Sequence, residues 1–386
     1  MLSTPERAPL PARIRFDRNE LAGSFGDIGT DLPLLAAMIP AAGLDAASVF
    51  IVFGLAQAIS GVLYGLPMPM QPLKAMAVLV ITHQLSGDLL YGAGLAIGLI
   101  MLVMSVTGLL NWIARIVPPC VVRGVQLGLG LQLANLALGK YVPAEGLPGY
   151  VLAGLCFLIG VALFRHRRFP AALPIIGLGL AYAACFDLDL DAIAAGAGFH
   201  LPRPHVPLPN EIWTGLFVLA LPQLPLSVSN SIIATHKTLG DLFPERPQTL
   251  KKIGLTYSLI NLIVPFFSGI PVCHGCGGLA GHAAFGARTG GSVILYGALY
   301  VVIGLFFGGS TEHVFRIFPQ PVLGIILLFE ALLLMSFLRD TANDQRAFLI
   351  ALLVATAAMT LPQGFAIGFV VGTLLHYLPV RYTFSR

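Results

Sequence analysis

Residues 66–77 read Leu-Pro-Met-Pro-Met-Gln-Pro-Leu-Lys-Ala-Met-Ala and interrupt a long apolar region. Pro67, Pro69 and Pro72 exclude a regular helix here, because proline lacks an N–H donor and clashes with the preceding turn. A helix can begin after Pro72, which places Lys74 in its first turn. The free N–H groups of that turn carry the positive end of the helix dipole and suit an anion. The alternative is a simple proline kink, with Lys74 reaching toward a membrane interface.

The composition indicates whether water or lipid surrounds this chain. The 386 residues include 22 Lys and Arg and 18 Asp and Glu, so only 10% are charged, whereas 56% are apolar. Soluble domains carry about 25% charged residues. With a mean hydropathy of +0.85, the chain is predicted to be a polytopic membrane protein whose outer surface faces lipid. The net charge of +4 gives no argument for nucleic acid, and five cysteines suit no disulfide framework.

The apolar runs predict an all-α protein of about fourteen spans, with a short, interrupted third and tenth span. We expect the spans at residues 21–42, 45–66, 68–84, 89–113, 117–139, 147–164, 170–186, 211–235, 250–270, 272–287, 290–309, 317–338, 345–361 and 363–380.

The distribution of basic residues predicts the orientation of these spans. With the N-terminus inside, the inner segments hold eighteen Lys and Arg residues, and the outer segments hold Lys140, Arg203 and Arg316. Lys74 lies within a span. This positive-inside bias favours an even number of spans and two cytoplasmic termini. Without an organelle signal, a prokaryotic inner membrane fits best.

A Pro-rich, acidic stretch divides the chain into halves. We expect a cytoplasmic tail at 1–20, a first repeat of seven spans at 21–186, an extracytoplasmic linker at 187–210 and a second repeat at 211–386. Because seven is odd, the second half is inverted relative to the first. Inverted repeats with broken helices that meet near the bilayer centre are typical of secondary transporters.

Three short matches support the repeat. Asn19-Glu20-Leu21 corresponds to Asn210-Glu211-Ile212, and Asp31-Leu-Pro-Leu corresponds to Gln223-Leu-Pro-Leu. Gly65-Leu-Pro-Met corresponds to Gly269-Ile-Pro-Val, at an offset of 204 residues. Each match is short, but the three follow the same order in both halves.

The counterpart of the opening stretch is residues 269–282, Gly-Ile-Pro-Val-Cys-His-Gly-Cys-Gly-Gly-Leu-Ala-Gly-His. Gly277 and Gly278 permit close approach of a ligand to the backbone, and a helix is expected to resume there. Two helix N-termini that converge would suit a small dianion. His274 could donate a hydrogen bond or exchange a proton. Close helix packing through small residues is the alternative.

Cys273 and Cys276 form a CxxC pair. Such a pair can be a redox centre or half of a metal site, but only His274 and His282 lie near it in the sequence. We expect packing or substrate-lining roles, with no metal and no cofactor.

Polar residues within spans one and eight are further candidates. Asp27, Thr30 and Asp31 share one helix face, and intramembrane carboxylates are usually functional. Span eight carries a stripe formed by Gln223, Ser227, Asn230 and Ser231. The alternatives are an interfacial or capping role for the acids and interhelical hydrogen bonding for the stripe. Glu330, in span twelve, is another buried acid without an evident partner.

These motifs together resemble one family. Gly26-Asp27-Ile-Gly-Thr30, Met-Gln71-Pro-Leu-Lys74-Ala and Cys-His274-Gly-x-Gly-Gly-Leu-Ala-Gly, followed by Phe285-Gly-Ala-Arg288-Thr-Gly, resemble the molybdate transporter family, a branch related to the sulfate permeases. Cys276 stands where that family is expected to have Ala. Because the sequence stops soon after the last span, we expect this protein to lack the regulatory domain of typical sulfate permeases.

The resemblance implies the fold of uracil permease, with spans 1–4 and 8–11 as a core and spans 5–7 and 12–14 as a gate. It implies a substrate site between the third and tenth half-helices and possible homodimers. By position, its substrate-binding residues are Thr30, Asp31, Gln71, Lys74, Gln223, His274, Gly277 and Gly278.

The leading hypothesis is a secondary transporter of a tetrahedral oxyanion, with molybdate first and sulfate or tungstate as further substrates. Proton coupling through Asp27, Asp31 or His274, with an elevator-like movement, accompanies it as a hypothesis. A different anion or a nucleobase is the alternative within the fold. A membrane thiol or metal enzyme that uses Cys273, His274 and Cys276 is the alternative of another class.

Overall fold

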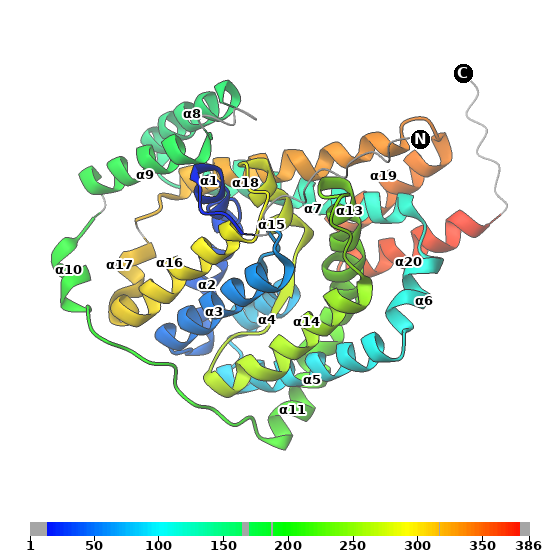
Figure 1. Cartoon of the computed structure of the whole chain (residues 1–386), viewed down its shortest axis with the longest axis horizontal. Helices are drawn as coiled ribbons and strands as arrows, with labels where there is room; N and C mark the ends of the chain where they lie inside the picture. Colours follow the sequence, from blue (N-terminus) through cyan, green and yellow to red (C-terminus); the bar gives the residue numbers. More distant parts are fainter. Residues whose placement is uncertain (1–13, 164–169, 187, 316, 379–386) are drawn as a thin grey trace, which may run out of the picture.

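The computed structural model describes residues 14–163, 170–186, 188–315 and 317–378 (Figure 1). Helices dominate these residues. Part of the predicted orientation signal lies outside the described ranges, namely Arg7, Arg13, Arg165, Arg167, Arg168, Arg316, Arg381 and Arg386. Most of the predicted tail at 1–20 lies outside them as well.

The first half of the chain contains the elements expected for seven spans. They are α1 (Arg18–Ser24), α2 (Ile28–Ala42), α3 (Ala46–Tyr64), β1 (Met70–Pro72), α4 (Lys74–His83), α5 (Gly87–Val106), α6 (Leu109–Ile116), α7 (Pro119–Leu136) with η1 (Ala137–Tyr141), α8 (Gly146–Ala162) and α9 (Ala172–Phe186).

The second half repeats this order after the linker helix α10 (Leu190–Ala195). Its elements are α11 (Pro209–Gly215), η2 (Leu216–Ala220), α12 (Leu221–Leu226), η3 (Ser227–Ala234), α13 (Thr235–Leu242), α14 (Leu250–Ile263), η4 (Val264–Phe267), β2 (Val272–His274), α15 (Cys276–Ala284), α16 (Gly291–Phe307), η5 (Gly308–Ser310), α17 (Thr311–Phe315), α18 (Gln320–Ser336), η6 (Phe337–Thr341), α19 (Gln345–Thr360) and α20 (Gly364–Tyr377).

The helix lengths agree with the predicted spans. Within the described residues, seven helical segments are long and apolar enough to cross a membrane, and five further apolar helices have 10–17 residues. The broken first span (α1 and α2) and the half-helix α15 complete the fourteen. Two boundaries differ from expectation. The fourth span ends at Val106, because Gly108 turns the chain with a φ of 81° before α6. The eighth runs from Pro209 to Leu242 and includes the π-helical segments η2 and η3.

The third and tenth spans are broken as predicted. Each passes through a short strand and then begins a half-helix, α4 at Lys74 and α15 at Cys276. β1 and β2 pair antiparallel, with Gln71 opposite Cys273. The pairing therefore places the starts of the two half-helices next to each other in the interior of the bundle (Figure 1).

The extended backbone of the strands cannot rely on water, so buried amides complete its hydrogen bonds. Gln57 on α3 donates to the carbonyl of Met70 and accepts from its N–H, at 2.7 and 2.8 Å. Asn261 on α14 does the same for Val272, at 2.6 and 2.9 Å. Gln57 and Asn261 are 204 residues apart, the offset of the Gly65 and Gly269 motifs. The sequence analysis did not single them out, although an amide within an apolar span was a usable signal.

The helices around this centre form a core and a gate. In the core, α3 packs along α16, and α5 packs against α14 and α11. In the gate, α7 packs against α18, α19 and α20, and α8 packs against α18. The linker, with α10, follows the outside of the molecule (Figure 1). It is held by hydrogen bonds from the N–H of His200 to the carbonyl of Leu305 and from the N–H of His205 to that of Phe266.

The outer helix faces carry large apolar side chains. Exposed examples include Leu55 and Ile59 on α3, Leu99 on α5, Leu158 on α8 and Leu374 on α20. Such a surface is stable against acyl chains and costly in water. The protein is therefore an integral membrane protein.

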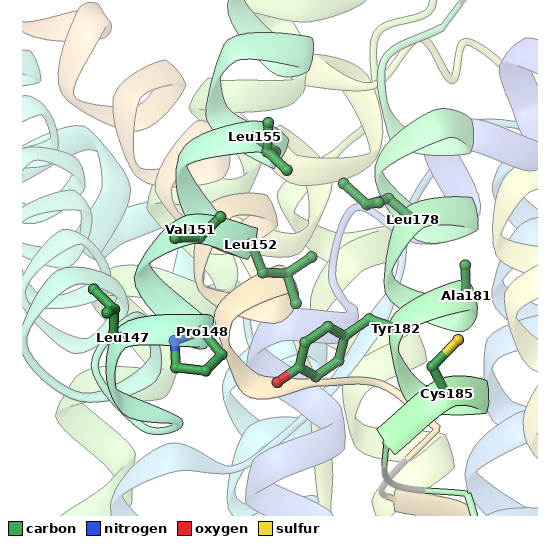
Figure 2. Close-up of a pocket in the computed structure, with 9 residues that line it drawn as sticks. All are labelled: Leu147, Pro148, Val151, Leu152, Leu155, Leu178, Ala181, Tyr182 and Cys185. Atoms are coloured by element: carbon green, nitrogen blue, oxygen red, sulfur yellow. The ribbon is translucent and has the colours of Figure 1, made fainter.

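A groove of about 560 Å³ lies between α8 and α9 (Figure 2). Its lining includes Leu152, Leu178 and Tyr182, and it contains no charged side chain. Because its lining is almost entirely apolar and carries no positive charge, it does not suit an anion.

Candidate functional site

The predicted site residues converge on the starts of the two half-helices. Asp27, Asp31 and Gln71 are completely buried, and Gln223 and Glu330 are 1% and 0% exposed. Buried polar groups in such number are costly unless they bond to one another or to a ligand. Their hydrogen bonds therefore show which groups are already engaged.

The N-terminus of α4 is engaged by span eight. Gln223 Oε1 accepts hydrogen bonds from the N–H groups of Ala75 and Met76, at 2.8 and 3.2 Å. The amide nitrogen of Gln223 donates to Ser227 Oγ at 3.1 Å, and that hydroxyl lies 2.8 Å from Tyr257 OH. The predicted polar stripe thus connects α12 and η3 to α4 and α14. Its π-helical turn is of the kind often found at functional positions.

The N-terminus of α15 is different. Its N-cap is Gly275, which has no side chain to accept a hydrogen bond, and within the described residues no other side chain caps it. Two carboxylates lie against its first turn. A Cβ on Gly277 would overlap Glu330 Oε1, and a Cβ on Gly278 would overlap Asp27 Oδ2. These glycines therefore permit the close approach of oxygen atoms, as the sequence predicted for a ligand.

The two acids of span one have separate partners. Asp27, in the break between α1 and α2, accepts a 2.6 Å hydrogen bond from Gln71 Nε2. Asp31, one turn further along α2, accepts a 3.2 Å hydrogen bond from Tyr296 OH on α16. Tyr296 in turn lies 2.9 Å from Tyr300 OH. The sequence analysis missed this tyrosine pair, which is four residues apart on one face of α16.

Lys74 supplies the positive charge of this site. Its ammonium is buried and, among the described residues, has no hydrogen-bond or ion-pair partner. Asp27, Asp31 and Glu330 all interact with it electrostatically. The second oxygens of these three carboxyl groups also have no hydrogen-bond partner in the described part of the chain, namely Asp27 Oδ2, Asp31 Oδ1 and Glu330 Oε1.

His274 lies in β2, but its ring faces α3 and α14. Nε2 lies 2.8 Å from Thr256 Oγ1, and Nδ1 lies 3.3 Å from the carbonyl of Pro69. The ring also packs edge-on against Tyr64, at 5.3 Å between centroids. Of the predicted residues, His274 is thus the one whose side chain is directed toward structural partners rather than the half-helix starts.

The two cysteines of the CxxC pair are reduced and buried. Cys276 Sγ donates to Asn230 Oδ1 at 2.9 Å, which engages that thiol in packing between α15 and η3. In the ranges that the structure describes, no three His, Cys, Asp or Glu side chains form a group able to hold a metal ion.

Inverted half-helices that meet at a closed, charged centre define a secondary transporter. The chain belongs to the molybdate transporter family: the family described as "Molybdate transporter of MFS superfamily" matches residues 19–133 and 215–334. Apart from residues 19 and 20, the first matched segment lies in the first predicted repeat, and the second lies in the second. The resemblance inferred from the motifs is thereby confirmed, and the chain is a transporter rather than an enzyme.

Individual relatives agree with this assignment. Molybdate transporter 1 of Arabidopsis thaliana is 34% identical over 414 residues, covering 95% of this chain and 89% of the relative. Molybdate transporter 2 of the same plant is 32% identical, covering 93% and 87%.

Among solved structures, the transmembrane domain of the cyanobacterial bicarbonate transporter BicA is similar in fold. It has a TM-score of 0.54 and 16% identity, and the match covers 92% of this chain and 99% of that domain. This likeness confirms the predicted inverted-repeat fold.

Proposed function

We propose that the protein is a secondary transporter of a tetrahedral oxyanion and that molybdate is its substrate. The observation that carries the proposal is the buried ammonium of Lys74, which no described side chain pairs, beside the uncapped N-terminus of α15. An unpaired buried cation is costly, so a bound anion is the natural partner. The names of the related molybdate transporters agree with this chemistry.

Molybdate presents four oxygen acceptors in a tetrahedron, so the site must supply donors from several directions. Lys74 and the N–H groups of Gly277 and Gly278 supply them, and the Thr30 hydroxyl, which donates to Glu330 in this structure, can join them when that bond breaks. Gln71 lies beside them, and Gln223 orients α4 through its backbone bonds. Recognition by a helix N-terminus and one lysine, without a cage of arginines, binds a dianion while still allowing its release.

We propose that the carboxyl groups carry the coupling protons. If Asp27, Asp31 and Glu330 were all ionised, three negative charges would face the single positive charge of Lys74. A dianion cannot join such a cluster in a water-poor site unless carboxylates are neutralised. Asp27 and Asp31 are therefore candidates for proton uptake with the anion. For His274 the proposal is weaker, because Thr256 and Pro69 already engage its ring.

Further aspects of the transport cycle belong to the same proposal. The core that carries α4 and α15 moves past the gate in an elevator-like step. Both termini face the cytoplasm of a prokaryotic cell, as the basic residues predict, and the protein forms homodimers. Sulfate and tungstate are competing substrates, because both are tetrahedral dianions.

Uptake of labelled molybdate into proteoliposomes tests the function. We expect saturable uptake that excess tungstate or sulfate inhibits and uracil does not. Lys74→Gln should reduce uptake at least about tenfold, since a group that binds charge directly contributes well over 1.4 kcal/mol. Lys140→Gln is the matched control, because Lys140 is an exposed lysine of η1. Absence of uptake under every imposed gradient would refute the proposal.

A further inference from the structure

Glu330 connects the gate to the proposed site. It lies on α18 of the gate and is completely buried. One carboxylate oxygen accepts a 3.4 Å hydrogen bond from Thr30 Oγ1 on α2 of the core. The other has no hydrogen-bond partner among the described residues and lies against Gly277 in the first turn of α15. A carboxylate of the gate therefore contacts the positive end of a core helix.

The proposed anion site lies at the same first turn of α15, whose N–H groups Glu330 does not engage. A carboxylate at a helix N-terminus gains the same dipole interaction as a bound oxyanion. Glu330 Oε1 and a substrate oxygen cannot both lie against Gly277 unless the carboxyl group moves or becomes neutral. Two facing negative charges in a buried site repel each other strongly.

We propose that Glu330 acts as a tethered competitor of the transported anion and as a proton-binding group that couples anion binding to the core–gate contact. The inference rests on the proposed function. When ionised, Glu330 holds the core against the gate through α15. When the anion binds, Glu330 takes up a proton, and the contact between core and gate weakens. The empty and the loaded carrier thus differ in how firmly α18 holds α15.

The charged and titratable groups facing Glu330 come from three directions. They are Asp27 and Asp31 from span one, Lys74 from α4 and Cys276 from α15. Among the gate elements packed on α18, α7, α8 and η1 contribute apolar contacts, and the charged residues of η6, Arg339 and Asp340, lie beyond the end of α18. Phe157 of α8 stacks near Phe329, and Gly130 of α7 lies against Met335. Tyr141 of η1 packs at Gly324, six residues from Glu330. The carboxyl cluster and Lys74 are therefore the groups with which Glu330 shares its protons.

Molybdate binding to the purified protein, measured by calorimetry between about pH 5.5 and 8, tests this coupling. For the wild type, Kd should rise with pH, because ionised carboxylates oppose the anion. In Glu330→Gln, the fold-change in Kd per pH unit should be about ten times smaller than in the wild type, because one fewer proton is linked to binding. Near pH 8 this variant should bind more tightly than the wild type.

Glu20→Gln is the matched control. Glu20 is also buried, but it accepts hydrogen bonds from the N–H groups of Arg288, Thr289 and Ser292 at the start of α16. It should keep the pH dependence of the wild type. Glu330→Asp, which keeps a titratable group, should also keep it. A melting curve without molybdate confirms that each variant is folded.

The outcomes separate the two proposals. If the wild type binds molybdate and Glu330→Gln shows the same pH dependence, the role of Glu330 is refuted and the proposed function stands. If the folded wild type binds no molybdate at any pH, the proposed function fails, and the role of Glu330 fails with it.

Discussion

At the scale of single residues, the site depends on glycines whose missing side chains leave room for neighbouring atoms. Gly278 is the third residue of α15, and Asp27 Oδ2 occupies the space of its absent side chain. Pro69 Cγ closes the same space, at 2.8 Å from the position of a Cβ. A methyl group there displaces either the carboxylate or the strand before α4. Position 278 therefore brings α15 into close contact with the side chains of Asp27 in span one and Pro69 before β1.

Gly278→Ala should abolish molybdate binding and lower the stability by about 1–3 kcal/mol, the usual cost of overpacking. Gly177→Ala is the matched control, because a Cβ at Gly177 in α9 meets nothing within 4 Å. At that exposed helical position, alanine should leave binding unchanged and raise stability by up to about 1 kcal/mol. Binding is measured by calorimetry and stability by thermal unfolding. Wild-type affinity in Gly278→Ala would contradict the close approach at α15.

At the scale of elements, a second contact joins gate and core at the ends of α7 and α13. Arg123 on α7 is 1% exposed and lies 2.5 Å from Asp241 on α13. It also pairs with Asp340 in η6. One turn further, Gln126 Nε2 donates to Thr238 Oγ1 at 2.8 Å. In the sequence analysis, Arg123 is only one of the eighteen inner basic residues, and Asp340 is not singled out. The structure shows instead a buried arginine that holds α7, α13 and η6 together.

If the core slides past the gate, the α7–α13 contact must break in each cycle. Cysteines introduced at Gln126 and Thr238 should therefore be joined by a short thiol-reactive cross-linker, and the link should stop molybdate uptake. Reduction of a cleavable linker should restore it. The two single-cysteine variants are the controls, since the five native cysteines remain in both. Full uptake by the cross-linked protein would exclude relative movement at this contact.

At the scale of the whole molecule, the net charge of the buried site determines whether protons must cross the membrane together with the anion. Within the described part of the chain, the fold encloses Asp27, Asp31 and Glu330 with Lys74 as the one cation at their centre, where water has little access. A dianion that enters this centre requires protons to enter with it, because uncompensated buried charge is costly. The direction of the proton gradient should thus determine the direction of net transport.

Proteoliposomes with an imposed pH difference test this dependence. Molybdate should accumulate on the alkaline side, and a protonophore should abolish the accumulation. At equal pH on both sides, uptake should only equalise the two concentrations. Accumulation that follows the membrane potential, without regard to the pH difference, would contradict proton coupling.

The sequence by itself determined the class and topology. The scarcity of charge required a membrane, and the prolines before Lys74 required a broken third span, since proline cannot continue a helix. The offset between Gly65 and Gly269 predicted the second break. These features are local or periodic, so a single sequence shows them. They sufficed to predict the fourteen spans and the inverted halves, whereas the family was predicted from the resemblance of the motifs around Asp27, Lys74 and His274.

Only the tertiary structure decided how the candidate residues are used. Gln223 accepts hydrogen bonds at the N-terminus of α4, whereas the N-cap of α15, Gly275, has no side chain that could do so. The ring of His274 contacts Tyr64 and Thr256. Glu330 belongs to α18 of the gate and lies against Gly277. Glu330 and Thr30 are 300 residues apart. Such pairings depend on how helices from both repeats cross in space, and no spacing along the chain encodes them.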